Sequence, residues 1–345
     1  MTLKPLAEQV VVITGASSGI GRVTARLAAE RGARTVVAAR NGEELEKLVA
    51  EIRAAGGRAA LQVADVAYPE EVELIAERAI SEFGLIDTWV NNAGVSLYGP
   101  IMDVELDDMR RLFDVNYWGV VHGSRTAVPH LARQGGALIN VASALAERSI
   151  PLQGTYCAAK HAVKAFTDSL RMELDDQGLP ISVTLVKPSS MNTPLFEKAR
   201  TVYEVEPQPV PPVYDPKVTA EAILRAATRP LREVTPGAMG KVMEVAEELS
   251  PRLTDRYMKR NTFDSQKSLV PLAPDRCDNL YEPLESDGGD VGHLYRGHVR
   301  QSSVYTWTAL HPRQAAGAVL LTGLGVAAFS ALRSLRRRRN GTWLH

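Results

Sequence analysis

The hydrophobic positions of this 345-residue chain fall into short continuous runs separated by longer amphipathic stretches. The first run, at 10–13, is four consecutive β-branched apolar residues, which is typical of a strand buried on both faces of a sheet. Similar runs predict strands at 34–39, 59–63, 88–90, 137–141 and 181–186. Between them, apolar residues recur at three- and four-residue intervals and predict helices over 22–32, 42–55, 70–83 and 107–131.

Buried strands that alternate with helices predict an α/β fold, a doubly wound parallel sheet of the Rossmann type with helices on both faces. Ligands of such a sheet bind at the carboxyl ends of its strands. We expect one domain over residues 1–250, which closes with a helix at 217–229 and a last strand at 233–235. The Pro-rich stretch 195–217 is expected to be a flap over the cleft or a plain surface loop.

The sequence changes character after the predicted domain. Over 251–312 the periodicity fades and Pro, Asp, Gly and Ser accumulate, which predicts a largely disordered linker. Residues 313–345 are expected to form an apolar helix with an Arg-rich end, a candidate membrane anchor. The uncharged stretch 314–332 would be about 28 Å long as a helix, close to the hydrocarbon thickness of a bilayer.

The arginines after this stretch, Arg333 and Arg336–Arg339, suit anionic lipid headgroups. If they stayed in the cytoplasm, a single span would place the rest of the chain outside the cell, so the orientation is open. The tail either inserts, docks on the membrane without crossing it, or covers an apolar groove on the protein or a partner.

A glycine-rich turn follows the first strand and opens the first helix. Strand, turn and helix in this order direct backbone N–H groups and a helix N-terminus at a phosphate pair, whereas the alternative is an ordinary tight turn. The spacing is Gly-x-x-x-Gly-x-Gly, and we expect a dinucleotide cofactor to be bound by Gly15, Ser17, Ser18, Gly19, Ile20 and Gly21.

The second strand ends at Arg40. A site that prefers NAD has an acidic residue there to bond the ribose 2′-hydroxyl, whereas a guanidinium suits a 2′-phosphate. We therefore predict NADP(H) as the cofactor in preference to NAD(H), with Arg40 as the main discriminator. Arg22 is expected to be a solvated residue of the first helix.

Tyr156 and Lys160 have the i, i+4 spacing that places two side chains on one face of a helix. An ammonium near a phenol favours the phenolate, so we expect Lys160 to lower the pKa of Tyr156 toward neutrality. A tyrosine tuned in this way can exchange a proton with a substrate oxygen. Ser143, thirteen residues upstream, follows the strand expected at 137–141.

These motifs, together with Asn91–Gly94 and Asn116, resemble in order and spacing those of the short-chain dehydrogenase/reductase family, over about residues 6–250. The resemblance implies a nicotinamide-dependent oxidoreductase that interconverts a carbonyl and a secondary alcohol. Its catalytic set would be Asn116, Ser143, Tyr156 and Lys160.

The resemblance also implies a role for each catalytic residue. Ser143 would stabilise the charge on the substrate oxygen, and Tyr156 would be the general acid in reduction and the general base in oxidation. Lys160 would hold the nicotinamide ribose. Asn116 would interrupt its helix and hold a water that links Lys160 to solvent.

For the cofactor, the resemblance implies an adenine contact at Asp65 and a backbone contact at Val66. Thr193 would bind the nicotinamide carboxamide, while Ser189 stands where the family has glycine. The remaining residues implied in the site are Asn92, Ala93 and Gly94. Members of the family form dimers or tetramers, so a homodimer or homotetramer is expected.

Composition excludes several classes. The formal net charge is zero, which gives no reason to expect nucleic acid, and the two cysteines and seven histidines show no metal-ligand spacing. The first strand begins within ten residues, so we expect no signal peptide and a cytoplasmic catalytic domain. A membrane tether favours a lipophilic substrate. The alternatives are an NAD-dependent alcohol dehydrogenase and a cofactor-binding scaffold or redox sensor without catalysis.

Overall fold

The computed structural model describes residues 2–285, 288–312 and 314–315. The chain divides into two units, Met1–Ser303 and Val304–His345, and the described part of the second contains the helix α10 (Val304–Leu310). The predicted membrane segment lies outside the described residues except for 314–315, and so does its arginine cluster. Among the residues that are described, no helix is long and apolar enough to cross a bilayer.

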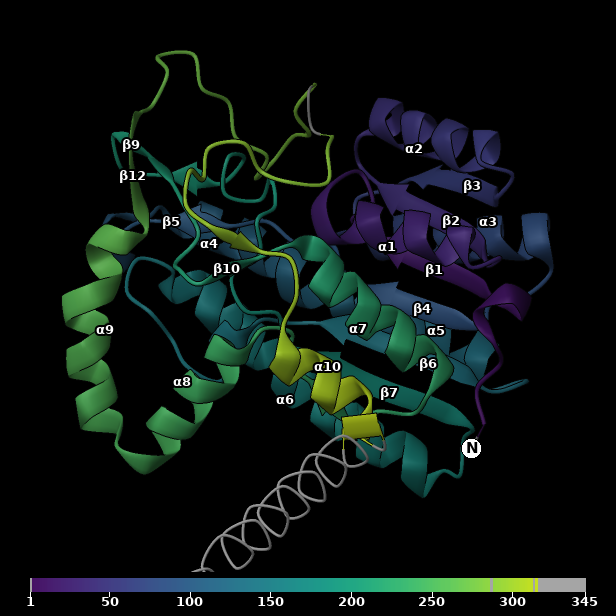
Figure 1. The fold of residues 1–345 in the computed structure, drawn as a ribbon. Helices are drawn as coiled ribbons and strands as arrows, with labels where there is room; N and C mark the ends of the chain where they lie inside the picture. The colour runs from purple at the N-terminus through teal and green to yellow at the C-terminus, as the bar shows by residue number, and fades with distance from the viewer. Residues whose placement is uncertain (1, 286–287, 313, 316–345) are drawn as a thin grey trace, which may run out of the picture. The chain divides into compact units, whose positions relative to one another are not determined.

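A parallel sheet in the order β11-β7-β6-β4-β1-β2-β3 forms the centre of the first unit (Figure 1). The chain order reverses at β1, which pairs with β2 on one side and with β4 on the other. A reversal of this kind opens a crevice at the carboxyl ends of the strands. The strands are β1 (Val10–Thr14), β2 (Arg34–Ala39), β3 (Arg58–Val63), β4 (Thr88–Asn91), β6 (Gly136–Val141), β7 (Ile181–Val186) and β11 (Glu233–Val234).

Helices cover both faces of this sheet, which confirms the doubly wound fold (Figure 1). One face carries α1 (Gly19–Glu30), α2 (Gly42–Ala54) and α7 (Pro216–Thr228). The other carries α3 (Pro69–Phe83), α4 (Leu106–Phe113), α5 (Gly119–Leu131) and α6 (Gly154–Asp176). Short 3₁₀ turns lie at Leu6–Glu8, Ile101–Asp103 and Ala144–Ala146.

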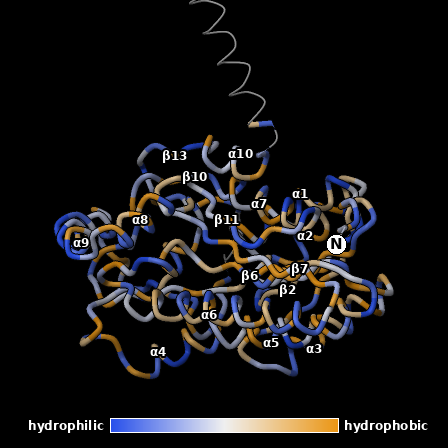
Figure 2. Tube along the Cα trace, turned by 90° about the horizontal axis from the view of Figure 1, so that it is seen from below, coloured by the Kyte–Doolittle hydropathy of each residue, from blue (hydrophilic) through white to orange (hydrophobic). Residues whose placement is uncertain are grey.

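The core follows from the hydrophobic runs. Every residue of β1 is buried, as a strand covered on both faces requires, and each buried valine contributes on the order of 1.5–3 kcal/mol. Trp89 of β4 is fully buried beside them. Figure 2 shows the central strands β6 and β7 in hydrophobic colours, whereas α9 is largely hydrophilic. The buried sheet therefore holds the carboxyl ends of its strands in fixed positions.

The chain after residue 250 differs from the predicted linker. It follows α8 (Ala238–Leu249) and contains α9 (Pro251–Ser265) and the strands β12 (Lys267–Pro271) and β13 (Val299–Arg300). β12 pairs with β9 (Val205–Pro207) and β13 with β10 (Val213–Tyr214), while β8 (Arg200–Thr201) pairs with β5 (Leu97–Tyr98). The stretch 195–217 is thus a frame of short strands, two of which the later segment extends.

Polar contacts to the rest of the fold explain why this segment is ordered without hydrophobic periodicity. The Nε atom of Arg276 lies 2.9 Å from both carboxylate oxygens of Glu206, and its Nη2 donates to the carbonyls of Glu197 and Ala199. Periodicity cannot detect such partners, since they are distant in the sequence. We call residues 266–303 the C-terminal extension.

The expectation that Arg22 is solvated is wrong. Its side chain is buried rather than solvated, and it forms ion pairs with Glu51 at 2.5 Å and with Asp290 at 3.5 Å. Asp290 belongs to the C-terminal extension and also pairs with Arg26 at 2.5 Å. The first helix is therefore an anchor for the extension.

Candidate active site

A cleft opens at the carboxyl ends of β1, β2, β4, β6 and β7. Ser143, Tyr156 and Lys160 line it, together with the glycine-rich turn. Asn116 lies beneath the cleft and is fully buried. The strand ends thus bring together residues that lie in separate sequence motifs. They meet at the carboxyl ends of the strands, where a doubly wound sheet is expected to have its ligand crevice.

Ser143 and Tyr156 form the centre of the candidate site. Ser143 follows β6, and its Oγ accepts a hydrogen bond from the amide of Leu145 at 3.1 Å. Tyr156 stands in the first turn of α6, and its hydroxyl hydrogen-bonds to Ser143. Burial raises the pKa of Tyr156 well above its ordinary value, while the bond to Ser143 lowers it in part. A substrate oxygen placed between the two hydroxyls would meet two donors.

The expected effect of Lys160 on Tyr156 is not found. The ammonium lies 5.6 Å from the centroid of the tyrosine ring and donates to the carbonyl of Val141 at 3.1 Å. Burial lowers the pKa of Lys160 to about 8. Because both side chains have lost solvent, desolvation outweighs their charge interaction, and the tyrosine is held as the neutral phenol.

Asn116 interrupts its helix, as the resemblance implied. A π-helical turn over Asp114–Trp118 separates α4 from α5. The Asn116 carboxamide bonds the backbone of Val95 in both directions, with Oδ1 accepting at 2.8 Å and Nδ2 donating at 2.9 Å. Gly94 has no side chain to fill the space beside Asn116 and Lys160. A Cβ at this position would lie 3.3 Å from Asn116 Oδ1 and 3.7 Å from Lys160 Nζ.

The glycine-rich turn is clamped to β4. The Thr14 hydroxyl accepts from the amides of Asn92 at 3.1 Å and Ala93 at 3.2 Å, and the Asn92 side chain donates to the carbonyl of Thr14 at 3.0 Å. A Cβ at Gly21 would lie 2.2 Å from the Gly15 carbonyl, so only glycine allows this close approach. The turn is therefore rigid at its base.

The donor set at this turn fits a dinucleotide. Gly19 starts α1, so the positive end of the helix lies at the cleft. In the structure the Gly19 amide donates to the carbonyl of Gly289 at 2.8 Å. A phosphate oxygen is an equivalent acceptor and would replace that carbonyl. Ser17, Ser18 and Ile20 line the same wall.

Arg40 lies in the cleft at the end of β2, but its guanidinium already has partners. It donates to the backbone carbonyls of Asn279 at 2.5 Å and Tyr281 at 2.7 Å, and it lies 4.0 Å from Asp65 Oδ2. Asp65 also pairs with Arg111. Arg40, Asp65 and Val66 line the same end of the cleft, where the adenosine contacts were expected. The C-terminal extension thus reaches the residue predicted to select the cofactor.

The loop after β7 closes the other side. Thr193 is buried against the turn, since a Cβ at Gly19 would lie 3.1 Å from the Thr193 Cβ. The hydroxyl of Ser189 donates to the Gly237 carbonyl and accepts from the Gly240 amide, both at 3.0 Å. The serine that replaces the family glycine therefore joins this loop to the start of α8.

Several lining residues were missed from the sequence. Lys198 and Asn279 stand near Arg40, and Tyr98 is buried near Tyr156. The outer wall is apolar and includes Met191, Phe196, Met239, Met243 and Met258. These residues come from loops and from α8 and α9, where no motif indicated a role in the site.

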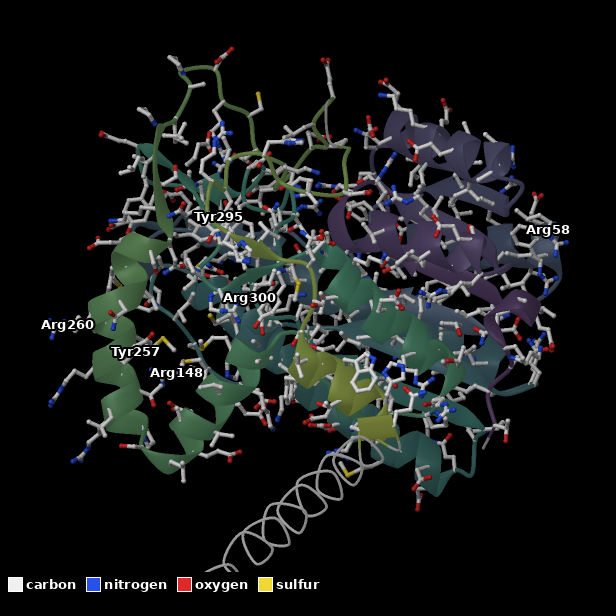
Figure 3. All side chains as sticks on the ribbon, in the orientation of Figure 1. Arg58, Arg148, Tyr257, Arg260, Tyr295 and Arg300 are labelled. Atoms are coloured by element: carbon white, nitrogen blue, oxygen red, sulfur yellow. The ribbon has the colours of Figure 1, made fainter. Side chains whose placement is uncertain are left out.

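Arg148 joins this wall to the catalytic centre. Its guanidinium pairs with Glu247 of α8 at 2.7 Å and with Asp255 of α9 at 2.5 Å. In Figure 3, Tyr257 and Arg148 lie on the inner side of α9, whereas Arg260 points away.

Within the described ranges, no group of three or more His, Cys, Asp or Glu side chains is placed to hold a metal ion.

The comparisons with known proteins agree with this geometry. The model of the short chain dehydrogenase family matches residues 9–204. The chain is 44% identical over 342 residues to the uncharacterized oxidoreductase YxnA of Bacillus subtilis, covering 97% of this chain and 94% of that protein. It is 36% identical over 219 residues to the cyclohexanol dehydrogenase of an Acinetobacter species, covering 62% of this chain and 86% of that protein.

The fold also resembles an alcohol dehydrogenase of the archaeon Thermococcus sibiricus, solved in complex with 5-hydroxy-NADP. The TM-score is 0.58 and the identity 26%, with 66% of this chain and 95% of that one covered. The fold and site define an oxidoreductase of the doubly wound α/β class. The chain belongs to the short-chain dehydrogenase/reductase family.

Proposed function

We propose that this protein is an NADP(H)-dependent oxidoreductase that interconverts a lipophilic carbonyl compound and its secondary alcohol. The observation that carries the proposal is the hydrogen-bonded pair of Ser143 and Tyr156, placed at the strand ends beside the glycine-rich turn. Lys160 and Asn116 complete the set beneath the same cleft.

A bound nicotinamide would supply or accept the hydride. The protein's part is to handle the proton and the charge on the substrate oxygen. Tyr156, held as a phenol, donates its proton to that oxygen in reduction, and Ser143 donates a hydrogen bond to the same oxygen. Lys160 then lies close enough to favour the phenolate that remains.

The preference for NADP(H) is supported by the end of β2, where Arg40 lines the cleft in the position of the acidic residue of an NAD site. The Thermococcus sibiricus relative in fold is complexed with an NADP analogue. One observation favours the alternative, an NAD(H)-dependent enzyme: the donors of Arg40 are engaged by backbone carbonyls. A 2′-phosphate would have to displace them.

The lipophilic substrate is supported by the outer wall of the cleft. Methionine side chains from the loop after β7 and from α8 and α9 line the same cleft as Ser143 and Tyr156, and thioethers adapt to bulky apolar groups. The Acinetobacter relative is named for cyclohexanol, an apolar secondary alcohol. We therefore place cyclic and long-chain ketones first among the substrates to test.

The test is a titration of the full chain with NADPH and with NADH, followed by turnover on a panel of lipophilic ketones. We expect tighter binding of NADPH, and turnover that falls roughly 10²–10⁴-fold in Tyr156→Phe without a change in cofactor affinity. Tyr68→Phe, in which the substituted side chain is exposed, is the matched control. Tighter binding of NADH would favour the alternative, and binding of neither cofactor would refute the proposal.

A further inference from the structure

The helix α9 carries a basic face on its solvent side. Four exposed cations stand at i, i+4, i+7 and i+8, a spacing that places side chains on one face of a helix: Arg252, Arg256, Lys259 and Arg260. In Figure 3, Arg260 points outward from α9. None of the four forms an ion pair with another described residue, and Asp255 of the same helix pairs with Arg148 instead. These cations are therefore available to an external partner.

Large apolar side chains are exposed beside this face. On α8, Val242, Val245 and Leu249 stand at i, i+3 and i+7 and are 53%, 41% and 80% exposed. Leu253, in the first turn of α9, is 62% exposed. The two leucines flank the turn between α8 and α9, which lies at the edge of the first unit (Figure 1). Exposed apolar side chains next to a charged face mark an interaction surface.

The carboxylates of the two helices do not neutralise this face. On α9, Asp255 and Asp264 stand against the four cations, and Asp255 is paired with Arg148. Of the three carboxylates of α8, one also pairs with Arg148, one is buried, and Glu248 is exposed. Four cations without an ion pair thus face two such carboxylates, so the surface attracts anions.

An anionic lipid bilayer fits both parts of this surface. Each Lys or Arg near anionic headgroups contributes about 1 kcal/mol, and exposed apolar side chains insert at the boundary of headgroups and acyl chains. An acidic peptide would use the cations but gives no reason for the two exposed leucines. The same helices also line the cleft, through Met243, Tyr257 and Met258. A bilayer on this surface would therefore lie beside the apolar wall of the cleft.

We propose that the basic face of α9 and the leucines of the α8–α9 turn dock this protein on membranes that contain anionic lipids. The inference is separate from the anchor expected in the tail, because every residue that it uses belongs to α8 or α9. One consequence, that a lipophilic ketone reaches the cleft from the bilayer, rests on the proposed function. The docking itself does not.

A fluorescent probe on the α8–α9 turn tests the docking independently of the tail. An environment-sensitive label is attached in the full chain to Leu253→Cys or, as control, to Leu74→Cys on α3, where the native side chain is 44% exposed. Cys277→Ser removes the exposed native thiol. With phosphatidylcholine vesicles that contain about one third phosphatidylglycerol, we expect blue-shifted emission at position 253 and none at position 74. Pure phosphatidylcholine should give little shift at either position.

Charge variants show whether the cations of α9 carry the binding. Arg256→Gln combined with Arg260→Gln should weaken binding to the anionic vesicles roughly 10- to 30-fold, at about fivefold per cation. Arg58→Gln combined with Arg229→Gln removes the same charge from exposed positions outside the two helices and should change binding less than about threefold. Thermal unfolding without vesicles shows whether each variant is folded.

Four results would overturn the inference. Unchanged emission at position 253, while the protein binds vesicles, would place the contact on another part of the chain. A shift without vesicles that grows with protein concentration would make the surface an interface between copies of this chain. An equal shift with polyglutamate would make it a site for acidic proteins, and equal losses in the two charge variants would leave only an effect of net charge. None of these measurements uses turnover, so failure of the proposed function would be seen separately.

Discussion

Lys160, a candidate catalytic residue, reduces the stability of the fold that holds it because its ammonium is buried. Its side chain is 3% exposed, and its ammonium donates to a backbone carbonyl. Burial lowers its pKa from 10.5 to about 8. The unfolded chain thus keeps its proton up to a higher pH than the folded chain, so stability rises with pH between about 8 and 10.5.

We predict that Lys160→Met stabilises the protein at pH 7 and abolishes turnover. A methionine removes the buried charge at similar volume, and at about 1.4 kcal/mol per pH unit the free energy of unfolding should rise by up to about 3 kcal/mol. The gain should shrink above pH 8 and vanish near pH 10.5. Urea unfolding at pH 7 and pH 10 measures it. A variant that is less stable than the parent at pH 7 would contradict the prediction.

At the scale of elements, α8 and α9 contribute to the wall of the cleft, and one side chain is paired with both helices. Arg148 follows the 3₁₀ turn after Ser143 and pairs with a carboxylate on each of the two helices. The Arg148 side chain is 13% exposed and that of Glu247 30%, so this ion pair is screened less than a surface pair, whereas Asp255 is 68% exposed and its pair is screened more. Arg148 therefore links the two helices to the segment that carries Ser143.

We predict that Arg148→Gln raises KM for a lipophilic ketone roughly three- to tenfold, because the helices that contact the substrate lose their tie to the site. The cofactor affinity should stay within about twofold, since the adenosine end is distant from α9. Steady-state kinetics at saturating cofactor measure the effect, with the exposed Arg252→Gln on α9 as control. A fall in kcat at unchanged KM would show that Arg148 acts on the chemical step instead.

At the scale of the first unit, the C-terminal extension is part of the fold. It adds strands to the frame at 195–217, anchors to α1 through Asp290, and contributes Asn279 to the cleft. Residues 2–250 alone would leave Arg40 and the α1 N-terminus without these partners. The domain is therefore larger than the matched family model, which ends at residue 204.

We predict that trypsin distinguishes an ordered extension from a linker. Arg276 is bound by Glu206 and by two carbonyls, whereas Arg296 is an exposed loop residue of the same extension. Mass spectrometry of a brief native digest should show cleavage after Arg296 and little after Arg276, while the urea-unfolded chain is cut at both. Equal native rates at the two sites would restore the linker interpretation.

The sequence by itself determined the sheet, the glycine-rich turn and the positions of Ser143, Tyr156 and Lys160. Buried parallel strands must be continuous apolar runs, and the chemistry at their ends requires particular residue types at short spacings. The pattern also located α7 and β11, but it predicted one helix over 107–131, and only the family resemblance implied the interruption at Asn116. The tail at 316–345 stays a prediction.

Only the tertiary structure decided what surrounds these motifs. Periodicity could not detect the extension, because polar pairs such as Arg276 with Glu206 hold it in place. The pKa of Tyr156 could not be derived from its i+4 neighbour, since burial of both groups outweighs their spacing. Lys198 reaches Ser18 and Asn279 reaches Arg40 from loops far along the chain, and contacts of that kind exist only once the chain has folded.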